Sequence, residues 1–220
     1  MPLLLTRRTL AVLAIAGFAL PALLPLAADA AGTSQPAGVM VTQEMSGAGA
    51  LGITSVTPVV LDPLTITNNS AVGSSQLVVT TSSATGYILT VKAADTPAMQ
   101  AGTSTAFEDL ATTTQTWAVS TNHYVFGFSA VGVDVYHSVY GTSTAIGTST
   151  TACEGVKNTP SATLRWRGFQ GNTQIEIASS SAPTTAGGNE TILCVADAQN
   201  GVFAPTGSYV ANITATATIL

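Results

Sequence analysis

The last segment of the chain, residues 209–219, alternates small or apolar residues with mainly polar ones over eleven positions. The odd positions hold tyrosine, alanine and isoleucine, and three of the five residues between them are threonine. A period of two places these two sets on opposite faces of an extended strand, whereas a helix would need a period of 3.6 residues. The segment therefore predicts a long β-strand with one buried face and one hydrated face.

Shorter alternations recur along the chain, separated by turn residues such as Asn68-Asn69-Ser70 and Asn200-Gly201. No stretch has a sustained helical period, and residues 98–110 are the only place for a short helix, which Gly102 weakens. Many short strands with regular turns are typical of an all-β fold, here a single antiparallel β-sandwich of about ten strands. The predicted strands are residues 39–42, 51–56, 64–67, 76–81, 87–93, 116–119, 124–130, 133–137, 162–167, 173–178, 191–197 and 209–219.

The composition supports this fold and excludes several classes of protein. Hydrophobic residues make up 46% of the chain and charged residues only 8%, against about 25% charged residues in an average soluble domain. Threonine and serine hydrate the surface without charge, and β-branched threonine favours strands over helices. A helical bundle, a coiled coil and a basic nucleic-acid binder are therefore not expected, and the net charge is −5.

The N-terminus predicts a cleaved signal peptide over residues 1–30. Arg7 and Arg8 precede an apolar run of about 17 residues, and Ala28-Asp29-Ala30 provides small residues at a cleavage site after Ala30. An uncleaved anchor is the alternative, although the run is short for a spanning helix. Thr6-Arg7-Arg8 also fits a twin-arginine signal, but we favour the general secretory route. We therefore expect a secreted or cell-surface protein of a prokaryote.

The rest of the chain predicts one domain. Residues 31–50 are rich in glycine, alanine and serine and are interpreted as a flexible or loosely structured segment. Residues 51–220 form the predicted β-sandwich, with a Thr/Ser/Gly-rich surface loop at 138–161. After residue 30 no apolar run approaches 18 residues, so no further membrane-spanning helix is expected.

Cys153 and Cys194 are the only cysteines in the sequence. Export to an oxidising compartment predicts a disulfide between them. Neither cysteine has a histidine or second cysteine at ligand spacing, so no metal site is expected there. Calcium-loop and cofactor motifs are also missing from the sequence, and no cofactor is predicted.

Catalytic motifs are missing as well, and the protein is predicted not to be an enzyme. His137 lies next to Ser138 and three residues after Asp134, but no Gly-x-Ser-x-Gly elbow accompanies them. A secreted polysaccharide hydrolase would need two carboxyl groups across a glycosidic bond. The available candidates for such a pair are Glu108, Asp109, Glu176 and Asp197.

Arg165-Trp166-Arg167 is the most distinctive tripeptide of the chain. On a strand, the two arginines face one way and Trp166 the other. This arrangement, with Trp117, suggests a site for a wall glycan or a protein partner; a buried tryptophan flanked by two solubilising arginines is the alternative. The aromatic residues at 124, 126 and 128 are interpreted as core residues.

The final strand also raises self-association as a hypothesis. A long, nearly uncharged strand pairs either within its own sheet or with a neighbouring molecule. The chain could then be a fibre or pilus subunit that polymerises by strand exchange through this strand, or through residues 39–42. A completed sheet within one chain is the alternative.

One family resemblance rests on the order of several segments. Residues 75–81 lead into Gly86-Tyr87-Ile88-Leu89, residues 117–129 follow, and the chain closes on residues 207–217. This order resembles a loose family of uncharacterised secreted bacterial surface proteins, similar to WxL-type cell-wall-binding domains. Trp117-Ala118-Val119 departs from the family's Trp-x-Leu signature, and the final strand holds no tryptophan. The resemblance implies a non-enzymatic structural or adhesion protein, with cell-wall polysaccharide or other envelope proteins as partners.

Overall fold

The computed structural model describes residues 37–46, 50–55, 58–102, 104–141 and 150–220, so the predicted signal peptide lies outside the described residues. Nearly all regular structure is β-strand, which confirms the predicted all-β class. The helical elements are α1 (His137–Tyr140) and the 3-10 turn η1 (Thr150–Ala152). The strands are β1 (Ala37–Ser46), β2 (Leu51–Ser55), β3 (Val59–Leu61), β4 (Ser70–Thr81), β5 (Tyr87–Ala93), β6 (Met99–Ala101), β7 (Thr105–Ala106), β8 (Glu108–Asp109), β9 (His123–Gly132), β10 (Ile175–Ser180), β11 (Asn189–Asn200) and β12 (Val210–Ile219).

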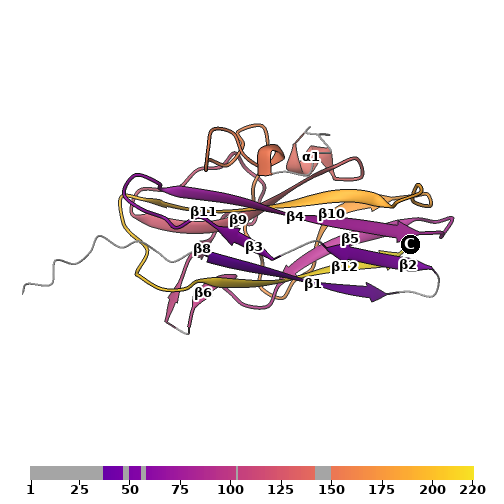
Figure 1. The fold of residues 1–220 in the computed structure, drawn as a ribbon, viewed down its shortest axis with the longest axis horizontal. Helices are drawn as coiled ribbons and strands as arrows, with labels where there is room; N and C mark the ends of the chain where they lie inside the picture. Colours follow the sequence, from indigo (N-terminus) through magenta and orange to yellow (C-terminus); the bar gives the residue numbers. More distant parts are fainter. Residues whose placement is uncertain (1–36, 47–49, 56–57, 103, 142–149) are drawn as a thin grey trace, which may run out of the picture.

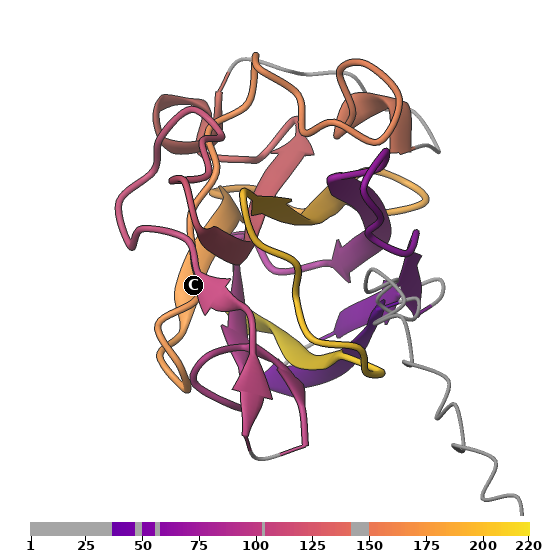
Figure 2. The same cartoon turned by 90° about the vertical axis from the view of Figure 1, so that its left-hand side faces the viewer.

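The strands form two curled sheets that enclose a common interior (Figures 1 and 2). Sheet A has the order β10-β5-β12-β1-β3, with β6 and β7 added beside β12. Sheet B has the order β2-β4-β11-β9-β8. Most neighbours are antiparallel, but β1 pairs with β12, and β8 with β9, in parallel. The sheets are therefore mixed, which corrects the prediction of a purely antiparallel sandwich.

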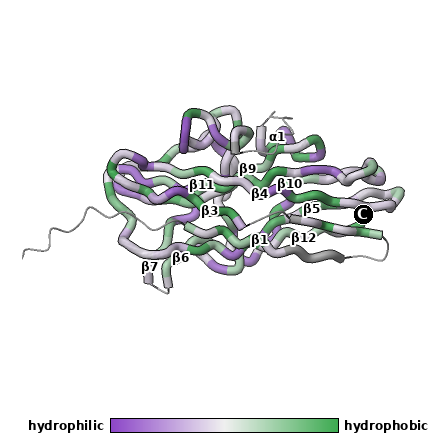
Figure 3. Tube along the Cα trace, in the orientation of Figure 1, coloured by the Kyte–Doolittle hydropathy of each residue, from purple (hydrophilic) through white to green (hydrophobic). Residues whose placement is uncertain are grey.

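The main core lies between the sheets and draws on both of them. Leu193 and Val195 of β11 face this core, together with Leu89 and Val91 of β5. A second, smaller core lies on the other face of sheet B, where Cys194 and Ala196 of β11 are covered by loops. Because β11 is buried on both faces, its central residues 192–196 are apolar at consecutive positions rather than at every second one. In Figure 3 the strands are mainly white and green, and purple is more frequent in the connecting loops.

The predicted final strand corresponds to β12 and lies inside sheet A. Its residues Ala211, Ile213 and Ala215 are buried, and its outward positions include Asn212 and Thr218, both exposed. Both of its edges are paired, one with β5 and β6 and the other with β1. The within-chain sheet therefore accounts for this strand, and the predicted donor segment 39–42 belongs to β1 of the same sheet.

Several expectations about single segments were wrong. Residues 98–110 form β6, β7 and β8 instead of a short helix. The predicted strands 64–67, 116–119, 133–137 and 162–167 are mostly loop, although isolated bridges occur at Val135, Trp166 and Arg167. Residues 162–167 alternate because Leu164 and Trp166 are buried in the second core, while Arg165 faces solvent. In contrast, the predicted strand 39–42 is present and belongs to the longer β1, which lies within the N-terminal segment 31–50.

Candidate functional site

The predicted binding tripeptide lies in a segment that returns along the edge of sheet B. The backbone N–H of Trp166 donates to the Gln115 carbonyl at 2.7 Å, and Arg167 exchanges two backbone hydrogen bonds with Phe128 of β9. Phe169 follows and stacks on Phe128, with ring centroids 4.3 Å apart. The segment is thereby anchored in both cores, by Trp166 on one face of the sheet and by Phe169 on the other.

Trp166 itself is a core residue. Its side chain has no exposed surface, and its indole N–H donates to the Ser161 carbonyl at 3.1 Å. Its ring meets that of Trp117 edge-on, with centroids 5.2 Å apart. Trp166 therefore offers no surface to a ligand in this conformation, while Trp117 remains half-buried.

Arg165 and Arg167 occupy different environments. Arg165 is exposed, whereas Arg167 is half-buried and lines a groove of about 440 Å³. The Arg167 Nε atom is buried and has no hydrogen-bond partner among the described residues. Burial raises the pKa of the Tyr140 phenol to about 12, although the neighbouring Arg167 guanidinium acts to lower it. The guanidinium therefore lies close to Tyr140.

The groove combines hydrogen-bonding side chains with apolar surface. The Tyr136 hydroxyl donates to the Glu176 carboxylate at 3.1 Å, and the Tyr140 hydroxyl donates to the Glu176 backbone carbonyl at 3.1 Å. These two bonds hold the segment around α1 against the beginning of β10. The lining residues come from three parts of the chain and are Tyr136, Val139, Arg167, Gln170, Gln174, Ile175 and Glu176.

Such a lining suits a polyhydroxylated ligand. Guanidinium and amide groups donate to sugar hydroxyls, amide and carboxylate oxygens accept from them, and Tyr136 offers an aromatic surface. Small-molecule sites commonly combine an apolar floor with a few directed polar groups. We expect this groove, hereafter the Arg167 groove, to be able to hold part of a glycan chain.

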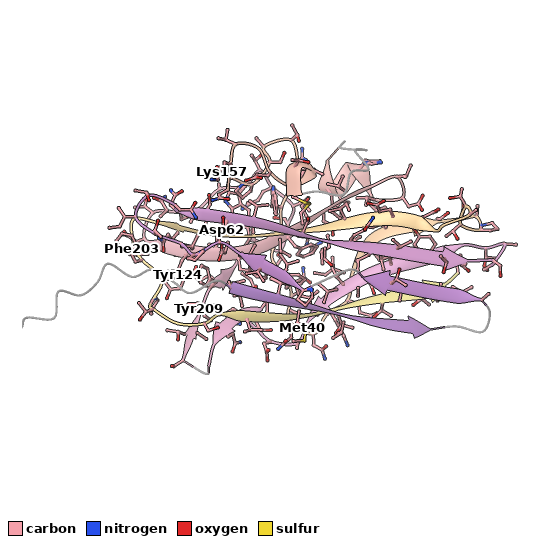
Figure 4. All side chains as sticks on the ribbon, viewed as in Figure 1. Met40, Asp62, Tyr124, Lys157, Phe203 and Tyr209 are labelled. Atoms are coloured by element: carbon pink, nitrogen blue, oxygen red, sulfur yellow. A yellow bond between two sulfur atoms is a disulfide. The ribbon has the colours of Figure 1, made fainter. Side chains whose placement is uncertain are left out.

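Trp117 lies away from the Arg167 groove and lines another hollow. That hollow has a volume of about 300 Å³ and includes Asn69, Gln199 and Asn200 but neither arginine. A third, polar hollow of about 490 Å³ lies between Asp62 and Lys157, both labelled in Figure 4. The four predicted binding residues are therefore divided among the core, open solvent and two separate hollows.

The candidate carboxyl groups of a hydrolase are also dispersed. Glu176 is the one carboxylate that lines the Arg167 groove. Glu108 lies in β8 of the other sheet, where its carboxylate contacts His123 Nδ1 at 2.8 Å. Asp109 accepts the backbone N–H of Ala98, and burial raises its pKa to about 6. The structure thus places no two of these groups together in the groove.

Asp197 is buried in the main core face of β11, opposite Ala71 and Phe126. Its carboxyl is about 1% exposed, and its Oδ1 atom has no partner among the described residues. Burial raises its pKa well above the usual value, and hydrogen bonds from the backbone of Ala71 and of Asp197 itself oppose that rise. Its location in the core suits a structural group rather than a surface catalyst.

The predicted disulfide is confirmed. Cys153 and Cys194 are joined, with their Cα atoms 5.4 Å apart, and both are fully buried. Cys194 faces the second core from β11, so the bond fastens the loop around η1 to the outer face of sheet B. In the described part of the chain no group of three His, Cys, Asp or Glu side chains is arranged to hold a metal ion.

Sequence reasoning identified Arg167 but missed the residues opposite it. Tyr136, Gln170 and Gln174 belong to no motif, and only the contact between the α1 segment and β10 brings them to the groove. Glu176 was noted only as a hydrolase candidate. An alternation pattern reports which residues face a sheet, but it does not report which loops meet at its edge.

No protein-family model matches the chain, and no curated protein matches it. Among the described helical segments, none has the length and apolar character needed to cross a membrane.

Proposed function

We propose that this chain is a non-enzymatic structural or adhesion protein of a prokaryotic cell surface that holds cell-wall polysaccharide in the Arg167 groove. The observation that supports this proposal best is the half-buried Arg167, which lines a groove together with Tyr136, Glu176 and two glutamines. Secretion is part of the proposal; the buried disulfide is compatible with an oxidising compartment. The order of segments that resembles WxL-type domains points to the same class of partner.

The two arginines provide a matched test. Replacing Arg165 or Arg167 by alanine removes the same charge, but only Arg167 lines the groove. The chain without its predicted signal peptide (residues 31–220) and both variants would be sedimented with purified cell-wall material. The fraction of protein bound would be measured against the concentration of wall material. A hydrogen bond to a charged group contributes about 1.5–3 kcal/mol, so R167A should weaken binding at least about tenfold. R165A should bind within about twofold of the unsubstituted chain.

Arg167 also contacts Tyr140, so its loss could disturb the fold as well as the site. Q170A and Q174A alter exposed groove residues without touching the core, and each should weaken binding while the melting temperature stays unchanged. Equal binding by R165A and R167A, or no binding by the unsubstituted chain, would refute the proposal. Release of soluble sugars that E176Q abolishes would favour the hydrolase instead.

A further inference from the structure

The Arg167 guanidinium is a positive charge without a negative partner in the described part of the chain. Arg167 is half-buried, and the one ion pair among the described residues joins His123 and Glu108 in sheet B. Residues 142–149, which follow α1 in sequence and lie outside the described ranges, contain no aspartate or glutamate. A cation that loses part of its hydration without gaining a counter-charge is unfavourable, and an anionic ligand would compensate for that loss.

Arg165 shows why the surroundings of the charge matter. Among the described residues Arg165 has no ion pair either, but its side chain is exposed and water solvates it. Exposed charges gain little from pairing, so the missing partner carries no information at Arg165. At Arg167 the Nε atom is buried and has no hydrogen-bond partner among the described residues. The unmet demand for a partner is therefore specific to Arg167.

The Glu176 carboxylate lines the same groove but does not neutralise Arg167. It accepts a hydrogen bond from the Tyr136 hydroxyl at 3.1 Å, and it makes no ion pair with the guanidinium. Glu176 is exposed, so water screens its charge more strongly than the charge of half-buried Arg167. The less hydrated of the two charges in the groove is therefore positive.

The backbone that carries Arg167 is fixed in position. Arg167 exchanges two hydrogen bonds with Phe128, and the next N–H, that of Gly168, donates to the Ala111 carbonyl at 2.9 Å. A Cβ atom at Gly168 would lie 2.0 Å from the Leu110 carbonyl oxygen, so the backbone packs directly on that residue. A backbone that is already ordered loses little entropy when a ligand binds.

We infer that the group held at Arg167 is anionic, a carboxylate or a phosphate carried by an otherwise hydroxyl-rich chain. This inference rests on the proposed function, because it names the kind of polysaccharide that the Arg167 groove would hold. A guanidinium can donate two parallel hydrogen bonds to two oxygens of such a group. Gln170 and Gln174, both exposed in the groove, would bind the neighbouring hydroxyl groups.

Soluble probes that differ in charge test this inference without any substitution. Tetragalacturonate and its methyl ester share one sugar backbone and the same hydroxyl groups, but only the acid carries carboxylates. Poly(glycerol phosphate) supplies phosphate instead. In isothermal titration calorimetry with residues 31–220, at least one anionic probe should bind about tenfold more tightly than the methyl ester. Raising the salt concentration from about 50 mM to about 500 mM should weaken that binding severalfold and leave the ester unaffected.

The two anionic probes also distinguish the source of the charge. Tighter binding of tetragalacturonate would assign the anion to an acidic sugar. Tighter binding of poly(glycerol phosphate) would assign it to a phosphodiester-linked chain. Both results support an anionic ligand, and they differ only in which wall polymer carries it.

Three glutamine variants test the charges of the protein. R167Q should weaken binding of the better anionic probe at least about tenfold, while the matched variant R165Q should stay within about twofold of the unsubstituted chain. E176Q removes the like charge but keeps an acceptor for the Tyr136 hydroxyl, so the anionic probe should bind about two- to fivefold more tightly. A neutral glycan whose hydroxyls donate to Glu176 would instead bind E176Q more weakly.

The outcomes separate this inference from the proposed function. A chain that sediments with wall material but binds neither anionic probe more tightly than the methyl ester would overturn the inference and leave the proposed function in place. Binding of an anionic probe through Arg167, without sedimentation on wall material, would do the reverse. Unchanged binding by an R167Q variant that melts like the unsubstituted chain, or weaker binding by E176Q, would also overturn the inference. If R167Q does not fold, the comparison of acid and ester still decides.

Discussion

The disulfide allows a quantitative prediction about stability. Cys153 and Cys194 are 41 residues apart in sequence, and their bond closes the segment that covers the outer face of sheet B. In the chain-entropy model, a loop of this length restricts the unfolded state by about 4 kcal/mol at 25 °C. The double variant C153A/C194A should therefore lose about 4 kcal/mol of unfolding free energy, which is a large part of the usual 5–15 kcal/mol.

The assay is equilibrium unfolding in guanidinium chloride, followed by tryptophan fluorescence. Trp166 is fully buried in the core that the disulfide closes, so its emission reports the loss of that core. Adding a thiol reductant to the unsubstituted chain should lower the midpoint as the double substitution does. The double variant should not respond to reductant, which separates the bond from other effects of the reagent.

Two results would refute this reasoning. A loss below about 1 kcal/mol would mean that the covering segment is already restricted in the unfolded state, so that the entropy argument does not apply. Two free thiols in the purified chain would mean that the bond does not form. The second result would also remove one support for an oxidising compartment.

Three further predictions concern buried carboxyl groups and one glycine. Because burial raises the folded-state pKa of Asp197 above its unfolded value, the unfolded state loses the proton first. The contribution of Asp197 to stability should then be fully present below about pH 4 and fall as pH rises, by at most about 1.4 kcal/mol per pH unit. D197N should lack this contribution when urea unfolding is compared at about pH 4 and about pH 8, and an equal pH dependence of both chains would contradict the argument. Asp109, with a pKa of about 6, should add a similar fall confined to the window from about pH 4 to pH 6, visible as a difference between the unsubstituted chain and D109N within that window only. In G168A the new methyl group would lie 2.0 Å from the Leu110 carbonyl oxygen, so the segment beside Arg167 must shift. We expect the free energy of unfolding to fall by about 2 kcal/mol or more in the same assay. No measurable loss would contradict this expectation and would show that the segment can shift at little cost.

Long alternating segments were predicted well because they depend on local physics. Residues 87–93 coincide with β5, and residues 209–219 with β12 apart from their first residue. Each of these strands has one face toward the main core, so apolar residues repeat with period two. The buried sequence 191–197 was also assigned to a strand, β11, because it is short, apolar and bounded by turn residues.

Predictions failed where contacts between distant segments give a loop the alternation of a strand, or where a strand is too short to show any alternation. Residues 162–167 alternate because a loop lies on sheet B and buries Leu164 and Trp166. The very short strands β7 and β8 carry no periodic signal, because two residues cannot show a period. They pair only because the chain around them is held next to β6 and β9.

The sequence by itself determined the all-β class, the pairing of the two cysteines and the presence of Arg167 as a candidate binding residue. These features depend on composition, on a period of two and on the number of cysteines, all of which are local or countable. Only the tertiary structure decided that Trp166 is buried, that Tyr136 and Glu176 line the same groove as Arg167, and that β1 pairs in parallel with β12. Parallel pairing joins residues about 170 positions apart, and the hydrogen bonds that produce it are made by backbone groups that every residue carries. The pattern of side chains along a strand therefore predicts which face of the strand is buried. Which other strand pairs with its edge depends on how the whole chain packs.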